Sequence, residues 1–126
     1  MDIRRAIPVL VTDEPEATRR FYEDFLGFRV AMEEDGLLML ASRSVPTTQV
    51  IVAWASPTAM DAAVCQLDAS IEVEDVDAAY ADAQARGLDI VRPIGDEPWG
   101  IRRFFVRDPG GATINVASHA PSSSRR

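Results

Sequence analysis

Apolar and polar positions follow two different periods along the first half of the chain. Residues 3–12 form a short apolar run rich in β-branched side chains, and residues 14–27 carry apolar side chains at helical spacing. Asp13 stands where a helix N-cap is expected, and Gly27 stands where a helix ends. The pattern therefore predicts a strand and a helix, followed by three strands over residues 28–34, 36–42 and 48–54.

The second half repeats this order. The segment "DVDAA" at 75–79 resembles "DEPEA" at 13–17, and it opens a second amphipathic pattern over residues 76–87. Alternating runs at 68–75, 88–94, 100–108 and 112–118 predict the matching strands. We therefore expect an α+β protein, a single domain over residues 1–119 made of two tandem β-α-β-β-β modules. The expected boundaries are about 3–54 and 68–117 for the modules, 55–67 for the connector and 120–126 for a disordered tail.

Aromatic side chains on the two helices and strands are candidates for the core. Their positions in the apolar runs predict that five of them are buried: Phe21, Tyr22, Phe25, Phe28 and Phe105. The tryptophans are different, because an amphipathic ring at the edge of a strand can also contact a ligand. Trp99 precedes Gly100 at such an edge, and Trp54 ends the fourth strand run of the first half.

Composition excludes several classes of function. The net charge is −7 and all 13 basic residues are arginine, which argues against nucleic acid as a partner and excludes Schiff-base chemistry on lysine. The single cysteine, Cys65, cannot form an intramolecular disulfide. No apolar run is long enough to cross a bilayer, so we expect a soluble, cytoplasmic protein without a membrane partner.

Three segments resemble the vicinal oxygen chelate superfamily, which includes glyoxalases, extradiol dioxygenases and bleomycin-resistance binding proteins. They are "VTDEPEATRRFYEDFLGF" (11–28), "EVEDVDAAYADAQARG" (72–87) and "FFVRDPGGATINV" (104–116). The resemblance implies two β-α-β-β-β modules whose mixed sheets curl around a cavity, usually in a homodimer. It leaves function open, because isomerases, dioxygenases, transferases and plain binders share this fold.

The resemblance also identifies the positions at which metal-dependent members hold their ion. They are the position seven residues before each helix-opening acid and one position on the last strand of each module. Here they are occupied by Ala6, Gln49, Asp68 and Asn115. Alanine offers no lone pair and amide oxygens are weak ligands for transition metals, so we expect neither a metal site nor a cofactor. His119 lies four strand residues beyond Asn115, about 13 Å away, which is too far to share an ion.

Strand periodicity sorts the remaining candidates by face. If "DPGG" is a four-residue turn, Arg107 pairs with Ala112 and Phe104 lies opposite Asn115. The face toward the cavity then carries Ala6, Pro8 and Leu10 on the first strand, Asp68, Ser70 and Glu72 on the fifth, and Arg102, Phe104, Thr113 and Asn115 at the end of the chain. Together with Trp99, Gln49 and Trp54, the last four are the candidate ligand-binding residues.

Three functions remain open at this point. The first is a metal-free binding protein of the bleomycin-resistance type that sequesters an aromatic or cationic small molecule. The second is a metal-independent isomerase or lyase in which Glu72, Asp68 or His119 acts as the base. The third, a metal-dependent glyoxalase-like enzyme, is the least favoured, because the chain contains one histidine. All three imply a small-molecule partner, and we expect a homodimer.

Overall fold

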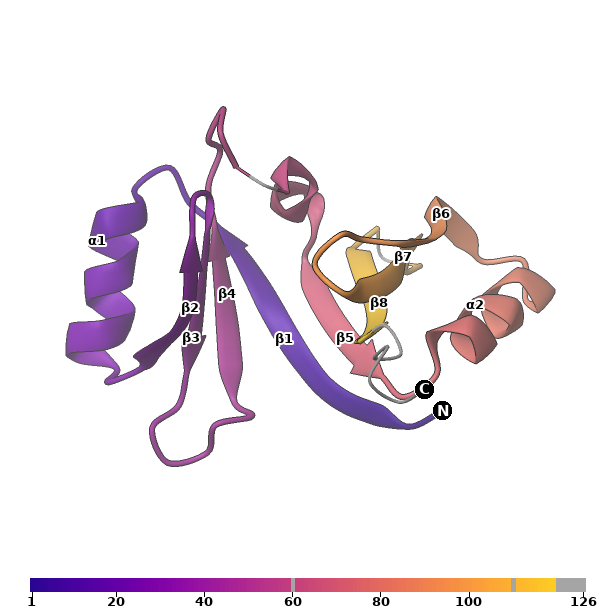
Figure 1. Ribbon diagram of the computed structural model, residues 1–126, viewed down its shortest axis with the longest axis horizontal. Coiled ribbons are helices and arrows are strands. Elements are labelled where there is room, and N and C mark those ends of the chain that lie inside the picture. Colours follow the sequence, from indigo (N-terminus) through magenta and orange to yellow (C-terminus); the bar gives the residue numbers. More distant parts are fainter. Residues whose placement is uncertain (60, 110, 120–126) are drawn as a thin grey trace. The chain divides into compact units, whose positions relative to one another are not determined.

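The computed structural model describes residues 1–59, 61–109 and 111–119. The predicted α+β order is confirmed, since each half of the chain reads β-α-β-β-β (Figure 1). The elements are β1 (Ile3–Val11), α1 (Pro15–Arg20) continuing into a π-helical segment (Phe21–Phe25), β2 (Arg29–Glu34), β3 (Leu37–Ala41), β4 (Gln49–Ala53), a 3-10 helix (Ala62–Gln66), β5 (Ala69–Val73), α2 (Val76–Ala85), β6 (Asp89–Asp96), β7 (Ile101–Arg107) and β8 (Thr113–His119). The tail predicted to be disordered, 120–126, lies outside the described residues.

The chain divides into two compact units whose boundary differs from the expected module boundary. One unit is Ile7–Asp68, and the other joins Met1–Ala6 to the residues from Ala69 onward. The start of β1 belongs to the second unit because the backbone N–H of Glu74 donates to the carbonyl of Asp2 (3.1 Å). A nine-residue strand is about 30 Å long, so its two ends can have different neighbours. The expectation of one domain stays a prediction.

In the unit Ile7–Asp68 the strands are ordered β2-β3-β4-β1, with β1 parallel to β4 and the other pairs antiparallel. Its buried cluster is Leu38, Leu40 and Val52, against which Tyr22, Phe28 and Trp54 pack. Val9 pairs with Ile51 and Leu10 with Val52, so Leu10 is on the side of this cluster. The prediction that Pro8 and Leu10 lie on the cavity side of β1 is therefore wrong, because that side of the strand packs on the core cluster. Residues 7–11 are all apolar, so alternation cannot set the parity of this strand.

The first helix also departs from the expectation. Glu14, not Asp13, is the N-cap residue, and its side chain makes no capping bond; its N–H donates instead to Thr12 Oγ1 (3.0 Å). The prediction that Phe21 and Phe25 are buried is wrong, since their exposed fractions are 51% and 74%. A π-helical turn advances by more residues than an α-helical turn, so it rotates these two rings away from the core.

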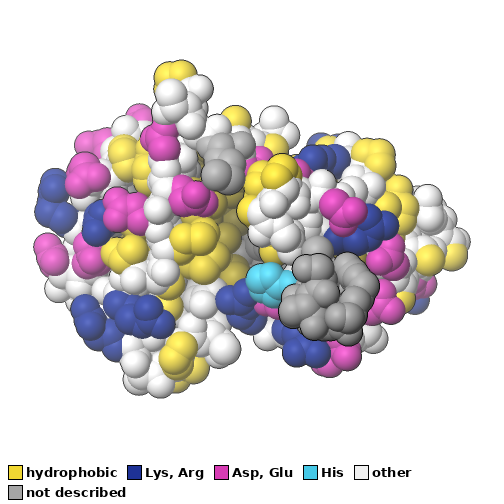
Figure 2. Space-filling model, viewed as in Figure 1, with side chains coloured by type: hydrophobic (Ala, Val, Ile, Leu, Met, Phe, Trp, Pro, Cys, Tyr) yellow, Lys and Arg dark blue, Asp and Glu magenta, His cyan; other side chains and the backbone are white. Residues whose placement is uncertain are grey.

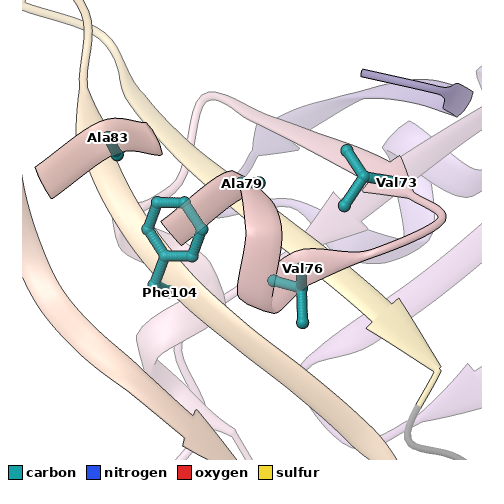
Figure 3. Packing of buried hydrophobic residues seen from close by; sticks show 5 residues of the cluster. All are labelled: Val73, Val76, Ala79, Ala83 and Phe104. Carbon is teal, nitrogen blue, oxygen red and sulfur yellow. The ribbon is translucent and has the colours of Figure 1, made fainter. Parts of the chain in front are cut away.

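The second unit orders its strands β5-β8-β7-β6, with β5 parallel to β8 and the other pairs antiparallel. Helix α2 begins at Asp75, whose carboxylate accepts a hydrogen bond from the Ala78 N–H (3.1 Å) as an N-cap should. The helix contacts β6, β7 and β8. Its buried side, together with two strand residues, makes the cluster shown in Figure 3: Val73, Val76, Ala79, Ala83 and Phe104.

The turn between β7 and β8 corrects the predicted register by one residue. Asp108 donates its N–H to the Ala112 carbonyl (2.9 Å), and its carboxylate accepts from the Ala112 N–H (2.9 Å). Because these two residues face each other, Arg107 pairs with Thr113 and Phe105 with Asn115. The predicted pairs of Arg107 with Ala112 and of Phe104 with Asn115 are wrong.

The shift exchanges the two faces of β7. Phe104 pairs with Val116, is 2% exposed, and its ring points toward α2 (Figure 3). Arg102 lies on this side too, where Asp77 of α2 and Asp96 accept its hydrogen bonds. The hydrogen bond from Arg102 lowers the pKa of the Asp77 carboxyl. The side of β7 that faces away from α2 carries Arg103, Phe105 and Arg107. The sequence pattern predicts the opposite, with these three residues away from the cavity.

Candidate ligand-binding site

The side of the second unit's sheet that faces away from α2, called the open face below, brings polar and aromatic side chains into adjacent rows. One row crosses all four strands: Ser70 pairs with Asn115, Asn115 with Phe105, and Phe105 with Arg92. The next row contains Glu72, Ala117 and Arg103. The open face therefore has a polar end on β5 and β8 and an aromatic end on β7 and β6.

Asn115 is the centre of the polar end. Its side-chain Nδ2 donates to Ser70 Oγ (3.0 Å), and the residue is only 6% exposed. Its Oδ1 is fully buried and has no hydrogen-bond partner in the described part of the chain. Buried side-chain acceptors are normally satisfied, so this oxygen is an exception that calls for an explanation.

Glu72 is the ionisable group of the polar end. Arg5 Nε donates to Glu72 Oε1, and His119 Nε2 lies 3.7 Å from Glu72 Oε2. The Glu72 side chain is mostly buried, whereas that of His119 is 64% exposed. The carboxylate therefore has one oxygen held by a permanent cation and the other near a group that can exchange protons with solvent.

At the aromatic end two guanidinium groups share one carboxylate. Glu97 Oε2 accepts from Arg103 Nε (2.9 Å) and lies 2.7 Å from Arg92 Nη2. The Arg103 guanidinium lies over Phe105 (5.0 Å from the ring centroid) and over Trp99 (5.5 Å), and the Arg92 guanidinium lies over Phe105 (5.3 Å). These are cation–π distances, and they stack two guanidinium groups on the Phe105 ring next to Asn115.

Sequence reasoning missed this guanidinium cluster. It assigned Arg103 and Phe105 to the far side of β7 because of the one-residue error at the turn, and it left Arg92 and Glu97 without a role. A signal was available in the chain itself, because "RRFF" places an arginine and a phenylalanine on both faces of the strand. Only the length of the turn decides which pair faces α2.

The predicted ligand-binding residues are found in several places. Thr113 is buried on the open face with Asn115, and Trp99 contacts Arg103 there. Phe104 and Arg102 lie on the opposite side, which contradicts the predicted face. In the unit Ile7–Asp68, Gln49 Nε2 donates to the Pro46 carbonyl (3.0 Å), and Trp54 packs beside Val52 in the core. A ligand contact for any of these residues stays a prediction.

A family model decides the affiliation of the chain. The model of the glyoxalase/bleomycin resistance protein/dioxygenase superfamily matches residues 6–116. The chain belongs to this superfamily. The match spans both β-α-β-β-β halves and ends within β8.

Solved structures of the superfamily share the fold at low sequence identity. A member from Vibrio splendidus 12B01 is 18% identical over 92% of this chain and 98% of its own, with a TM-score of 0.70. Methylmalonyl-CoA epimerase from Mycobacterium tuberculosis is 17% identical over 99% of this chain and 92% of its own (TM-score 0.71). The Streptomyces coelicolor methylmalonyl-CoA epimerase is 21% identical over 95% and 96% (TM-score 0.71). Comparison with curated protein sequences finds no significant match.

The four positions predicted from the resemblance as metal-ligand positions fit a metal poorly in this chain. Ala6 has no donor atom, and the Asn115 amide is committed on its nitrogen side to Ser70. Asp68 is an exposed carboxylate just before β5, and its backbone carbonyl accepts from the Val9 N–H (3.0 Å). Within residues 1–59, 61–109 and 111–119, no group of three or more His, Cys, Asp or Glu side chains could hold an ion. One carboxylate with neutral amides is a weak donor set for a transition metal.

The surface carries both signs of charge. Figure 2 shows acidic side chains in magenta and arginines in dark blue interspersed with apolar side chains in yellow on the face in view. Among the described residues, no helix has the length and apolar character needed to span a membrane.

Proposed function

We propose that this superfamily member is a small-molecule binding protein of the bleomycin-resistance type, which holds an aromatic or cationic ligand with its own side chains rather than through a metal ion. The observation that carries the proposal is the side-chain amide at position 115. The position that would hold a metal-binding carboxylate has an amide, and that amide is built into a side-chain network through Ser70 (3.0 Å).

The aromatic end of the open face supports the same function. Small-molecule sites combine aromatic surface with a few placed polar groups. The Trp99 ring contacts the Arg103 guanidinium and is still 40% exposed, so part of the ring is open to a ligand. The net charge of −7 attracts cationic molecules to the protein as a whole.

Tryptophan fluorescence tests the proposal with proflavine, a planar aromatic cation. We expect saturable quenching with one proflavine per chain, because the dye stacks near Trp99. The Trp99→Ala variant should lose this quenching, whereas Trp54→Phe, whose remaining tryptophan is Trp99, should keep it. Quenching that never saturates, or that survives Trp99→Ala and disappears in Trp54→Phe, would contradict a binding site at the open face.

A second candidate function is a metal-independent isomerase. The observation that favours it is the distance of 3.7 Å between His119 Nε2 and Glu72 Oε2, which joins a mostly buried carboxylate to an exposed proton carrier. Two methylmalonyl-CoA epimerases share the fold. In such a reaction the Glu72 carboxylate takes a proton from carbon and a proton is then returned to the substrate, so that the product has the same composition; His119 lets the proton on Glu72 exchange with solvent between the two steps. Turnover that survives chelation and is lost in Glu72→Gln would establish this function instead.

A further inference from the structure

Asn115 Oδ1 is a hydrogen-bond acceptor without a donor at the polar end of the open face. It is fully buried, and no donor in the described part of the chain reaches it. One of the two N–H groups of the same amide is already used, since Nδ2 donates to Ser70 Oγ (3.0 Å). The oxygen is the polar atom of this side chain that has no hydrogen bond within the described residues.

Leaving such an oxygen unpaired is unfavourable, and an apolar residue of similar size would avoid the cost. Burying an unsatisfied acceptor destabilises a fold, whereas replacing both members of a hydrogen-bonded pair, here Asn115 and Ser70, by apolar groups of the same shape can be nearly neutral. Neighbouring positions of β8 show that apolar residues are accommodated, since Ala117 is buried on the same face. The retained amide is thus better explained by a partner from outside the chain than by packing.

The groups around Asn115 determine the chemistry of that partner. The open face offers two further acceptors within the adjacent positions of β5, the Ser70 hydroxyl and the Glu72 carboxylate. The neighbour on β7 is Phe105, whose ring is already covered by the Arg103 guanidinium at 5.0 Å. The oxygen therefore lies between the hydroxyl and carboxylate side chains of β5 on one side and the Phe105 ring with its stacked guanidinium on the other.

We propose that the ligand of this site donates an N–H or O–H hydrogen bond to Asn115 Oδ1, so that the protein selects donor-bearing molecules over analogues of the same charge and ring that lack a donor. This inference rests on the proposed binding function and adds the class of ligand to it. A group that cannot donate leaves the oxygen unpaired or displaces a water without replacing its hydrogen bond, and either loses affinity.

Two matched pairs of probes test the selection in the unmodified protein. Benzylammonium and benzyltrimethylammonium carry the same charge and ring, but only the first has N–H donors. Benzyl alcohol and benzyl methyl ether make the same comparison without charge and with a smaller change in bulk. Dissociation constants come from chemical-shift titrations of ¹⁵N-labelled protein, followed at the Asn115 side-chain amide. We expect the donor-bearing member of each pair to bind about tenfold more tightly.

Two variants assign the selection to the amide oxygen. Asn115→Leu should bind both members of each pair equally, and Asn115→Asp, which keeps an acceptor, should retain the preference for the donor. Thermal unfolding verifies that each variant is folded. If Asn115→Leu does not fold, the ratio of dissociation constants within each probe pair, measured on the wild-type protein, still tests the inference. Equal binding of both members by the wild-type protein would overturn the inference while leaving the binding function intact. Failure of all four probes to bind would count against the binding function itself and against this inference with it.

Discussion

Phe104→Ala should destabilise the protein by about 3–5 kcal/mol, the largest effect of any single substitution considered. The ring is 2% exposed and lies in the cluster with Val73, Val76 and Ala79, and it meets Tyr80 edge-on at 5.0 Å. A largely apolar pocket of about 140 Å³ that opens to the surface borders it between α2 and the sheet. Truncation removes the contacts of the ring and leaves space that the surroundings fill only in part, which is the cause of the loss. Urea unfolding followed by circular dichroism measures the change.

Phe104→Leu is the matched control, and its loss should be smaller because most of the buried volume is kept. The position of Phe104 under α2 also predicts that proflavine binding is unchanged in this control, once the folded fraction is taken into account. A Phe104→Ala variant that keeps its stability and loses proflavine binding would instead put the ring in the ligand site.

Glu97→Ala should destabilise the protein by about 2–4 kcal/mol. Both partners of this ion pair are nearly buried: the side chains of Arg103 and Glu97 are 6% and 10% exposed. Arg92 also lies 2.7 Å from the same carboxylate oxygen. Removing Glu97 leaves two guanidinium groups close together over Phe105 without the carboxylate that they share, so the loss includes the repulsion between them. Thermal unfolding by calorimetry measures it.

Asp96→Asn is the control for Glu97→Ala. Asp96 lies 3.2 Å from Arg102, but its side chain is 69% exposed, and exposed ion pairs contribute little. The loss should be below about 0.5 kcal/mol. Equal losses in the two variants would mean that burial does not distinguish these pairs, and the cluster would then be an ordinary surface network.

Most of the fold could be predicted from the sequence because its signals are local. The order of strands and helices follows from hydrophobic periods, and the acid Asp75 marks the start of α2 as an N-cap. The exceptions have physical causes. The π-helical turn over Phe21–Phe25 exposes two rings that α-helical spacing would bury, and no residue in that segment announces such a turn.

The site was less predictable, because it depends on the register between strands. Asn115, Ser70 and Glu72 were assigned to one face correctly, since β5 and β8 alternate clearly between apolar and polar positions. The faces of β7 were exchanged because the length of one turn, from Asp108 to Ala112, sets the parity of the whole strand. The partners of Asn115 in space could not be found from spacing at all, since Ser70 is 45 residues away.

We propose that side chains, and not a bound metal, make the ligand site of this superfamily member. Calorimetric titration of the chelator-treated protein with Zn²⁺, and separately with Ni²⁺, tests this most directly. Because the predicted metal-ligand positions hold Ala6, Gln49, Asp68 and Asn115, we expect no saturable binding of one ion per chain at about micromolar affinity. One ion bound per chain at that affinity or tighter, and lost in Asp68→Asn, would contradict the account.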